Sequence, residues 1–517
     1  MYSIDSSLLI FVTIELSQYF KITGMGDLIR SILSELSKLG FKIIVIAPLF
    51  DSQYSGIRFK EPITIRRVFQ GQLRTQEVRV GEDEKGIHYY FLPGDSLWDY
   101  IKQGGVGSRT ETSGRSWLDF CHSVLMLIDG LKEREFDNVE KVIAHIFHWQ
   151  SAPLLALLNR VQWRPKAQLV LTVDVLEEQG RFSSQVLDTH EIFHSLRPSC
   201  EGEFNFLLSG LNSADIVHTV SPSYAREIQV RPNGGGLEKV FRELYDQGRL
   251  VGILNGIDND LVDWRCIPVL RDNGLCITPT QSGVFEHKRR AKEIFQATAC
   301  LPLDPSAFLI SMGHRFCDQK NFGLIERAMD GLMQLNRRPQ IYLRAWPEPG
   351  NDDPDIDLWK KLVALSKRYR YNLAFLSPYD RDLSLADEGI FIDRFLYYAA
   401  SDLFLMPSVW EPCGLCQLEG MRFGAVPLAS AVGGLPDTVK PVTEHKDGWG
   451  FLLKDPTDAA DFVKRVATAM DIWFNNYQLW QEIVSRAMNF DSSISKTVDM
   501  YLAKLYFPDK PSKEIMR

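Results

Sequence analysis

Two glutamates and two glycine turns share one short segment in the second half of the chain. Residues 407–439 read PSVWEPCGLCQLEGMRFGAVPLASAVGGLPDTV, with Glu411 and Glu419 eight residues apart. A carboxylate accepts hydrogen bonds from adjacent hydroxyl groups, and backbone N–H groups at glycine turns can bind an anion. The segment is therefore a candidate for holding a sugar together with a phosphate. For Glu419 alone, a solvent-facing position on a helix is an equally good interpretation.

Basic residues follow two other predicted strands. Arg315 and Lys320 lie five residues apart across a turn, where both could clamp a diphosphate. Lys21 opens the motif KITGMGD, in which Gly24 and Gly26 stand between a strand and a helix, an arrangement that also lets backbone N–H groups approach an anion. A solvated basic loop or an ordinary strand-to-helix turn explains either motif when it is taken alone.

Histidines and cysteines raise the question of a metal. His145 and His148 lie three residues apart after a strand, a spacing that can mark a metal site or a proton-transfer site. No acidic partner is near them in the sequence, so a packing or surface role is at least as good an interpretation. Cys413 and Cys416 form a C-x-x-C pair, but no second pair completes a zinc site. We therefore expect neither a metal nor another cofactor.

The elements that must position these residues alternate between strands and helices. Residues 8–14 and 41–48 are apolar, strand-like runs, and residues 27–39 between them carry leucine and isoleucine at helical spacing. Such a strand–helix–strand unit predicts a parallel sheet covered by helices. A second series of the same kind begins near residue 308. We therefore predict an α/β protein with two Rossmann-like domains facing across a cleft.

The turn-rich stretch GILNGIDND at 252–260 suggests where the first domain ends. We place the first domain at residues 1–258, the second at 259–490, and a C-terminal helix and tail at 491–517 that could pack back on the first domain. Parallel α/β sheets bind ligands at the carboxyl ends of their strands, so we expect the ligand site between the two domains.

Composition and charge narrow the class of protein. The 517 residues are 45% hydrophobic and 24% charged, with a formal net charge of −8, which argues against a broad nucleic-acid-binding face. No apolar run reaches the ~20 residues of a membrane span. Residues 7–17 are apolar but follow no basic segment, so we interpret them as a strand and not as a signal peptide. We expect a cytoplasmic protein, or one of the plastid stroma if a transit peptide was removed, with no nucleic-acid or membrane partner.

Taken in order, these motifs resemble those of bacterial glycogen synthases and plant starch synthases. Glu15 with KITGMGD resembles the family's E…K-T-G-G-L-G-D, and EPCGLCQ at 411–417 resembles its E-P-C-G-L-T-Q. TVSPSYAREI at 219–228, GILNGID at 252–258 and GGLPDTV at 433–439 are similar to further family motifs. The resemblance covers most of the chain and implies the two-domain GT-B fold. It also implies a retaining transfer of glucose from a nucleotide-glucose, usually ADP-glucose, to the non-reducing end of an α-1,4-glucan.

The resemblance implies roles for individual residues as well. The reaction centre would include Glu411, which binds the transferred glucose, Arg315 and Lys320, which hold the donor phosphates, and Asp174. The donor side would further comprise Lys21, Gly24, Gly26, Cys413, Gly414, Leu415, Glu419, Gly433, Gly434 and Tyr379, the last packing on the nucleotide base. The acceptor side would comprise Glu15, His148, Gln150 and Asn255.

Departures from the family pattern cluster in the first half of the chain. The family has D-W-H-T or D-W-H-A where this chain has HWQS at 148–151, and T-I-H-N where it has TVDV at 172–175. In the family, the histidine that Asp174 replaces lies beside the reacting sugar. A carboxylate near a leaving diphosphate is repulsive, so Asp174 would have to be protonated or face elsewhere.

Three hypotheses follow. The chain is an active α-glucan synthase with an unusual reaction centre, or a glycosyltransferase retuned for another donor or acceptor, or a non-catalytic homologue that binds nucleotide sugar or glucan as a regulator or scaffold.

Replacing Asp174 by His should raise turnover if this position is merely degenerate, and should lower turnover if the site has been retuned.

Overall fold

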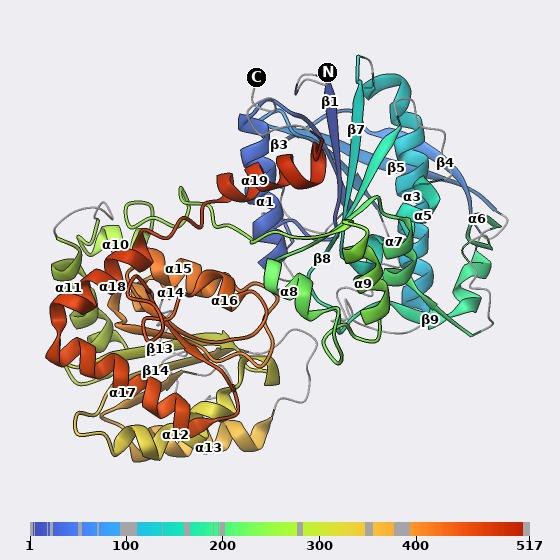
Figure 1. The fold of residues 1–517 in the computed structure, drawn as a ribbon. Helices are drawn as coiled ribbons and strands as arrows, with labels where there is room; N and C mark the ends of the chain where they lie inside the picture. The colour runs from blue at the N-terminus through green and yellow to red at the C-terminus, as the bar shows by residue number, and fades with distance from the viewer. Residues whose placement is uncertain are drawn as a thin grey trace. The chain divides into compact units, whose positions relative to one another are not determined.

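The computed structural model describes residues 4, 6–17, 19–20, 24–49, 54–69, 72–93, 111–136, 138–159, 166–189, 191–194, 196, 202–276, 283–346, 355–376 and 393–509. The chain divides into two compact units, drawn in Figure 1. The first comprises Met1–Asn255 with Ile494–Arg517, and the second comprises Gly256–Ser493. These boundaries lie within a few residues of the expected ones at 258 and 490. The C-terminal segment belongs to the first unit.

The first unit is built on a ten-stranded sheet with the order β12-β11-β8-β7-β1-β2-β6-β5-β3, and β4 pairs with β5. The strands from β12 to β6 are parallel, and those from β6 to β3 are antiparallel. The bounds are β1 Ser7–Val12, β2 Lys42–Pro48, β3 Ile57–Phe59, β4 Ile63–Phe69, β5 Gln72–Asp83, β6 His88–Leu92, β7 Lys141–Phe147, β8 Ala167–Val173, β11 Ile216–Thr219 and β12 Leu250–Gly252. A separate two-stranded sheet joins β9 (Arg181–Ser183) to β10 (Glu203–Asn205).

Helix α1 (Gly24–Lys38) shows why these sequences fold as they do. Its leucine and isoleucine residues recur at helical spacing and are buried against the sheet, as the sequence predicts. Gly40, with φ of 88°, follows the end of the helix in the left-handed conformation that glycine tolerates. The other helices are α3 Glu111–Glu135, α4 His148–Ser151, α5 Pro153–Leu158, α6 Glu191–His194, α7 Phe206–Ser213, α8 Pro222–Glu227, α9 Glu238–Asp246 and α19 Ile494–Tyr501, with 3₁₀ turn η1 at Ser184–Thr189.

The C-terminal segment is held to the first unit by buried polar contacts. Helix α19 packs against α1 and continues into a π-helical turn at Leu502–Tyr506. His145 contacts the Tyr506 hydroxyl through Nδ1 at 2.7 Å and the Thr172 hydroxyl through Nε2 at 2.6 Å. The same Thr172 hydroxyl lies 2.9 Å from Nδ1 of His218. All of these side chains are buried, so His145 has the packing role that the sequence left open.

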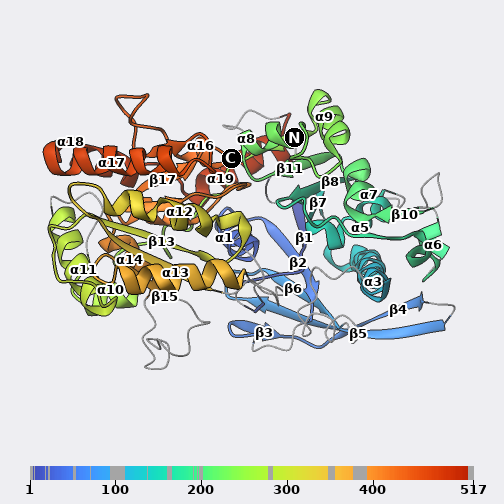
Figure 2. The same cartoon turned by 90° about the horizontal axis from the view of Figure 1, so that it is seen from below.

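The second unit is a six-stranded parallel sheet with the order β15-β14-β13-β16-β17-β18. Its strands are β13 Leu309–Arg315, β14 Gln340–Trp346, β15 Leu373–Leu376, β16 Leu403–Met406, β17 Val426–Ser430 and β18 Phe451–Leu453. Its helices pack in neighbouring pairs, such as α11 with α14 and α12 with α13, which can be followed in Figure 2. They are α10 Pro268–Asp272, α11 Val284–Thr298, α12 Phe322–Met333, α13 Ile356–Arg368, α14 Arg394–Ala400, α15 Cys416–Arg422, α16 Leu435–Thr438, α17 Ala459–Asn475 and α18 Tyr477–Met488, with 3₁₀ turn η2 at Asp318–Lys320.

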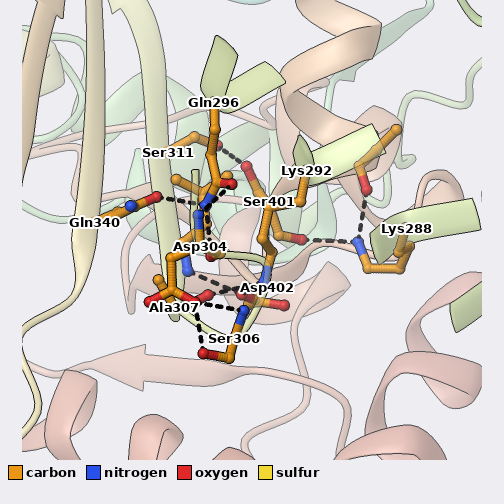
Figure 3. Close-up of polar contacts among 12 residues, drawn as sticks. Lys288, Lys292, Gln296, Asp304, Ser306, Ala307, Ser311, Gln340, Ser401 and Asp402 are labelled. Atoms are coloured by element: carbon orange, nitrogen blue, oxygen red, sulfur yellow. Dashed lines mark hydrogen bonds and ion pairs between the residues drawn. The ribbon is translucent and has the colours of Figure 1, made fainter. Parts of the chain in front are cut away.

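A buried ion pair anchors the amino ends of β13 and β16 (Figure 3). Lys292 of α11 lies 2.5 Å from Asp402, which precedes β16 and accepts a 2.8 Å hydrogen bond from the Leu309 N–H at the start of β13. On the same helix, Lys288 donates to the carbonyl oxygens of Ala399 and Ser401 at 3.0 and 2.8 Å. These contacts fix the two strands relative to each other. No helix among the described residues is long and apolar enough to cross a membrane.

Candidate functional site

Neighbouring strands bring Lys320 and Glu411 together. Strands β13 and β16 are parallel partners, with Ile310 opposite Leu403, so the loops after them emerge at the same edge of the sheet. Lys320 ends the 3₁₀ turn after β13, and its Nζ lies 2.5 Å from Oε2 of Glu411 in the loop after β16. Two motifs that the sequence singled out separately therefore form one site.

Glu411 is a buried but ionised carboxylate. Its side chain is 9% exposed, and Ser408 donates its hydroxyl to the same Oε2 at 2.9 Å. Burial by itself raises the pKa of Glu411. The nearby Lys320 ammonium and the hydrogen bonds from Lys320 and Ser408 outweigh that effect and hold the pKa below its ordinary value. Neither bond involves Oε1, so this oxygen can accept a hydroxyl of a ligand.

The glycine turn at Gly433-Gly434 packs against the backbone carbonyl of Glu411. The Gly434 N–H donates to the Glu411 carbonyl at 3.0 Å. Gly433 has φ of 52°, and a Cβ there would lie 1.8 Å from the same carbonyl oxygen. The N–H of Gly434 thus positions the Glu411 backbone, and only glycine fits at 433. The donor-side role expected of Gly433 and Gly434 stays a prediction.

The loop after β13 is tied to the Glu411 loop by a residue that the sequence analysis missed. Arg315 donates to Oε1 of Gln319 at 3.1 Å, and Nε2 of Gln319 donates to the Trp410 carbonyl at 3.1 Å. The Val409 N–H donates to the Gln319 carbonyl at 2.9 Å. Gln319 thereby connects the two candidate phosphate-binding residues to the Glu411 segment. Its place between Arg315 and Lys320 was the only available signal.

Two further residues missed by the sequence analysis stabilise the same edge. Asn321 adopts a left-handed conformation with φ of 57°, and its side chain donates to the carbonyls of Pro407 and Pro456. His314 contacts the Leu405 carbonyl through Nε2 at 3.0 Å. Burial, aided by the nearby charge of Lys320, lowers the pKa of His314 to about 3, so the imidazole is neutral at physiological pH.

Glu419 does not face solvent, which was the alternative for this residue. Its side chain is 12% exposed, and Oε1 pairs with Arg394 of α14 at 3.1 Å. Glu419 lies on α15, whose preceding turn contains Cys413, Gly414 and Leu415. Gln417 closes this turn by donating to the carbonyls of Cys413 and Gly414.

Neither thiol of the C-x-x-C pair is part of a disulfide. Burial raises the pKa of the Cys416 thiol, which keeps it protonated and unreactive. Within the described ranges, no group of three His, Cys, Asp or Glu side chains is arranged to hold a metal ion.

The first unit brings together Glu15, His148 and Asp174. These residues follow β1, β7 and β8, three adjacent parallel strands. The distance from Nε2 of His148 to Oε1 of Glu15 is 3.5 Å, and their side chains are 9% and 1% exposed. His148 has no acidic neighbour in the sequence, and strand pairing supplies one, Glu15, from the beginning of the chain.

Asp174 is only partly buried, and the charges of both of these groups act on it. Burial raises its pKa, the charge of His148 acts in the opposite direction, and the charge of Glu15 adds to the rise. The net direction is upward, toward the protonated form, which is one of the two states expected for Asp174 near a diphosphate. Gly26 lies against the same group, since a Cβ there would be 3.1 Å from Oε2 of Glu15.

The remaining candidates take no part in the contacts of Glu15 and Glu411 given above, or fall outside the described residues. Gly24 begins α1, and Gln150 is buried in α4. Asn255 follows β12 and is 8% exposed. Lys21 and Tyr379 fall outside the described residues, so their predicted roles stay predictions.

Comparisons with known proteins agree with these motifs. Residues 9–243 match the family model of the starch synthase catalytic domain, and residues 394–483 match that of glycosyl transferases group 1. A glycogen synthase of Lactococcus lactis is 30% identical over 515 residues, covering 95% of this chain and 98% of that protein. A glycogen synthase of Lactobacillus acidophilus is 28% identical over 513 residues, with the same coverage.

Two solved structures have a similar fold. The catalytic domain of starch synthase IV from Arabidopsis thaliana, bound to ADP and acarbose, gives a TM-score of 0.75 at 22% identity and covers 98% of this chain and 99% of its own. A sucrose-phosphate synthase from Thermosynechococcus elongatus gives 0.55 at 16% identity, with coverages of 97% and 98%. The α/β architecture with two Rossmann-like domains is the GT-B fold, as the sequence predicts.

Proposed function

The chain belongs to the family of glycogen and starch synthases, and from this premise we propose that it transfers glucose from ADP-glucose to the non-reducing end of an α-1,4-glucan. It is a glycosyltransferase of the glycogen and starch synthase type. The identity of the donor, the acceptor and the retention of configuration are the proposal. The observation that carries it is the buried, ionised Glu411 beside Lys320.

In the proposed reaction, the bond between glucose C1 and the diphosphate oxygen breaks, and a bond forms from C1 to an acceptor hydroxyl oxygen on the same face. The acceptor proton passes to the leaving phosphate, so the products are ADP and a glucan that is one glucose longer. Glu411 accepts hydroxyl groups of the transferred glucose and holds it in place. Arg315 and Lys320 neutralise the charge that develops on the diphosphate.

Two observations support the details of this proposal. The similar starch synthase IV structure contains ADP, which supports an adenine nucleotide on the donor side, and acarbose, which supports a saccharide acceptor. Arg315 and Lys320 supply two positive charges from one loop, so we propose that the transfer needs no metal. The cytoplasmic location expected from the sequence stays a prediction.

The test is transfer by the purified full-length chain. We expect label from ADP-[¹⁴C]glucose to enter glycogen or maltooligosaccharides, and an α-1,4-specific exoglucosidase to release it again as glucose. UDP-[¹⁴C]glucose in parallel reactions distinguishes the two nucleotide donors. Binding of ADP-glucose without any labelled product would contradict the proposal and favour a non-catalytic homologue.

Lys320→Ala tests the phosphate-binding role. We expect transfer to fall by at least about 100-fold, because the change removes one of the charges on the leaving diphosphate. Lys361→Ala is the matched control, since Lys361 is an exposed lysine of α13 in the same unit. Full activity of Lys320→Ala would show that this assignment is wrong.

A further inference from the structure

A pocket in the first unit lies beside the loop that follows Glu15. Its walls come from this loop, from helix α1 and from the turn between β5 and β6. Its empty space is about 320 Å³, which includes the part open to solvent. Leu16, Leu33 and Ile87 give it apolar walls. Neither Glu15 nor His148 is among the described residues that line it, so the pocket is separate from the group around Glu15.

The pocket contains a guanidinium group without a partner. Arg30 lies on α1 and lines the pocket, and its side chain is half-buried. In the part of the chain that the structure describes, Arg30 has neither a hydrogen bond nor an ion pair. A half-buried cation has lost part of its hydration without gaining a counter-charge. Its planar fork of N–H groups matches the oxygens of a phosphate or carboxylate.

Two hydroxyl groups of the loop after Glu15 add further unused donors. The Ser17 hydroxyl oxygen is buried without a hydrogen-bond partner, and the Tyr19 hydroxyl has no partner among the described residues. Burial, aided by the charge of Asp83, raises the pKa of Tyr19 to about 12, so the phenol keeps the proton that it can donate. Edge contacts with the rings of Tyr89 and Phe91, at 6.3 and 6.2 Å between centroids, hold the Tyr19 ring in place.

The acceptors of the pocket, in contrast, are already used. Oδ1 of Asp83 accepts the N–H groups of Lys85 and Ile87 at 2.9 and 3.0 Å. Oδ2 of Asp83 accepts the Tyr89 hydroxyl at 3.0 Å. The Lys85 ammonium donates to the Ser34 hydroxyl at 2.8 Å and has two further N–H groups. The pocket therefore has two cations for one carboxylate, and its unused groups are donors.

We propose that this pocket binds the phosphate group of a small molecule, with Arg30 as its main ligand and Ser17, Tyr19 and Lys85 as further donors. A phosphate monoester carries about −1.5 to −2 charges at pH 7 and three strong acceptor oxygens, which match these donors. The open side of the pocket leaves room for the rest of the ligand. The site belongs to the first unit and is distinct from Arg315 and Lys320 in the second. It does not rest on the proposed glucosyl transfer.

A ligand in this pocket would act on the segment directly after Glu15. The loop is closed by two backbone hydrogen bonds, from the Leu16 N–H to the Phe20 carbonyl at 2.9 Å and from the Phe20 N–H to the Leu16 carbonyl at 2.7 Å. Ser17 and Tyr19 lie between these two residues and line the pocket. A phosphate bound to both hydroxyls therefore stabilises the loop, and the backbone N–H groups of the loop should exchange hydrogen more slowly.

The test is calorimetric titration of the purified full-length chain with glycerol 3-phosphate at pH 7.5. We expect Arg30→Gln to weaken binding at least about 10-fold, because it removes the main positive charge on the phosphate. Tyr19→Phe keeps the ring and removes only the hydroxyl, and it should weaken binding at least about 3-fold. Lys38→Gln is the matched control, because it removes an exposed positive charge from the same helix and should bind like the wild-type chain.

Inorganic phosphate and glycerol in parallel titrations identify the source of the bound group. Glycerol should not bind. Tighter binding of glycerol 3-phosphate than of inorganic phosphate supports a site for phosphate esters, and equal binding supports a site for free phosphate. No binding of either phosphate compound to the wild-type chain overturns the proposal.

Hydrogen exchange locates the binding. We expect glycerol 3-phosphate to slow exchange at the N–H groups of Leu16, Tyr19 and Phe20 in the wild-type chain and in Lys320→Ala, but not in Arg30→Gln. Binding that Arg30→Gln leaves unchanged, or protection confined to the second unit, overturns the proposal, because the phosphate would then be bound elsewhere. These outcomes are the same whether or not the chain transfers glucose.

Discussion

At the scale of single residues, the second-unit site depends on one carboxylate held in a fixed position and charge state. Glu411 is ionised because Lys320 and Ser408 outweigh the effect of burial on its pKa. Its backbone is fixed by the Gly434 N–H and by the absence of a side chain at Gly433. Charge and position are therefore set by different neighbours and can be perturbed separately.

Gly433→Ala should displace the Glu411 backbone without changing the groups that set the charge of its carboxylate. A Cβ at 433 would overlap the Glu411 carbonyl oxygen at 1.8 Å, so the loop after β16 must move. We expect a loss of about 2–4 kcal/mol in the free energy of unfolding and a loss of most transferase activity, measured by urea titration and by the labelled-glucose assay.

Gly274→Ala is the control for Gly433→Ala. It measures the cost of placing alanine at a positive φ when the added Cβ meets no close backbone atom. Gly274 also has a positive φ, of 68°, but a Cβ there would meet only Arg290 atoms at 3.8 Å. We expect this variant to lose about 1 kcal/mol and to keep its activity. Equal effects of the two changes would show that close contact with Glu411 is not what requires glycine at 433.

At the scale of elements, the strands β13 and β16 carry the site at their carboxyl ends and are locked together at their amino ends. At those ends Lys292 and Asp402 form an ion pair, and their side chains are 4% and 7% exposed. The Leu309 N–H donates to the same Asp402 carboxylate. A buried pair of this kind adds little net stability over an apolar pair, but removing one partner leaves a buried charge uncompensated.

Asp402→Asn should therefore destabilise the second unit strongly. The amide keeps an acceptor for the Leu309 N–H but leaves the buried Lys292 ammonium without a counter-ion, bonded only to the Ala307 carbonyl, and we expect a loss of about 3–5 kcal/mol in a urea titration. Glu286→Gln on the same helix, α11, is the control, because Glu286 pairs with Arg289 at an exposed site and its replacement should leave stability close to that of the wild-type chain. Similar effects of both changes would contradict the anchoring role of Asp402.

At the scale of the whole molecule, the chain returns to its first unit after completing the second. Residues 494–509 pack on α1, and Tyr506 joins the buried contacts among His145, Thr172 and His218. Burial lowers the pKa of His218 to about 3 and that of His145 well below its ordinary value, so both imidazoles are neutral in the folded chain.

These buried histidines predict a loss of stability in acid. In the unfolded chain His218 binds a proton near pH 6.5, and in the folded chain only near pH 3, so the stability of the neutral form is fully present above pH 6.5. It is lost as the pH falls from 6.5 toward 3, by up to about 1.4 kcal/mol per pH unit for this group. His218→Gln should flatten the decline in urea midpoints between pH 7 and 4.

His194→Gln provides the comparison, because the His194 side chain is 48% exposed and lies outside the buried contacts of His218. Parallel acid profiles for His218→Gln and the wild-type chain would show that the buried imidazole does not contribute to acid unfolding.

Local patterns in the sequence predict most of the fold. The spacing of apolar residues places β1, α1 and β2 and the strands of the second series close to where the structure has them, because such periodicity depends only on neighbouring residues. The antiparallel extension by β3, β4 and β5 was not predicted. Its strands carry charged residues on an exposed face, so their apolar signal is weak.

The sequence by itself determined the fold class, the family and the identity of the carboxylate and basic residues around Glu411, because each rests on a contiguous motif. Only the tertiary structure decided their partners. Lys320 meets Glu411, Glu419 meets Arg394 and His148 meets Glu15 through the order of strands and helices in each unit. That order brings together residues far apart in the chain. It therefore sets the burial and charge of each site residue.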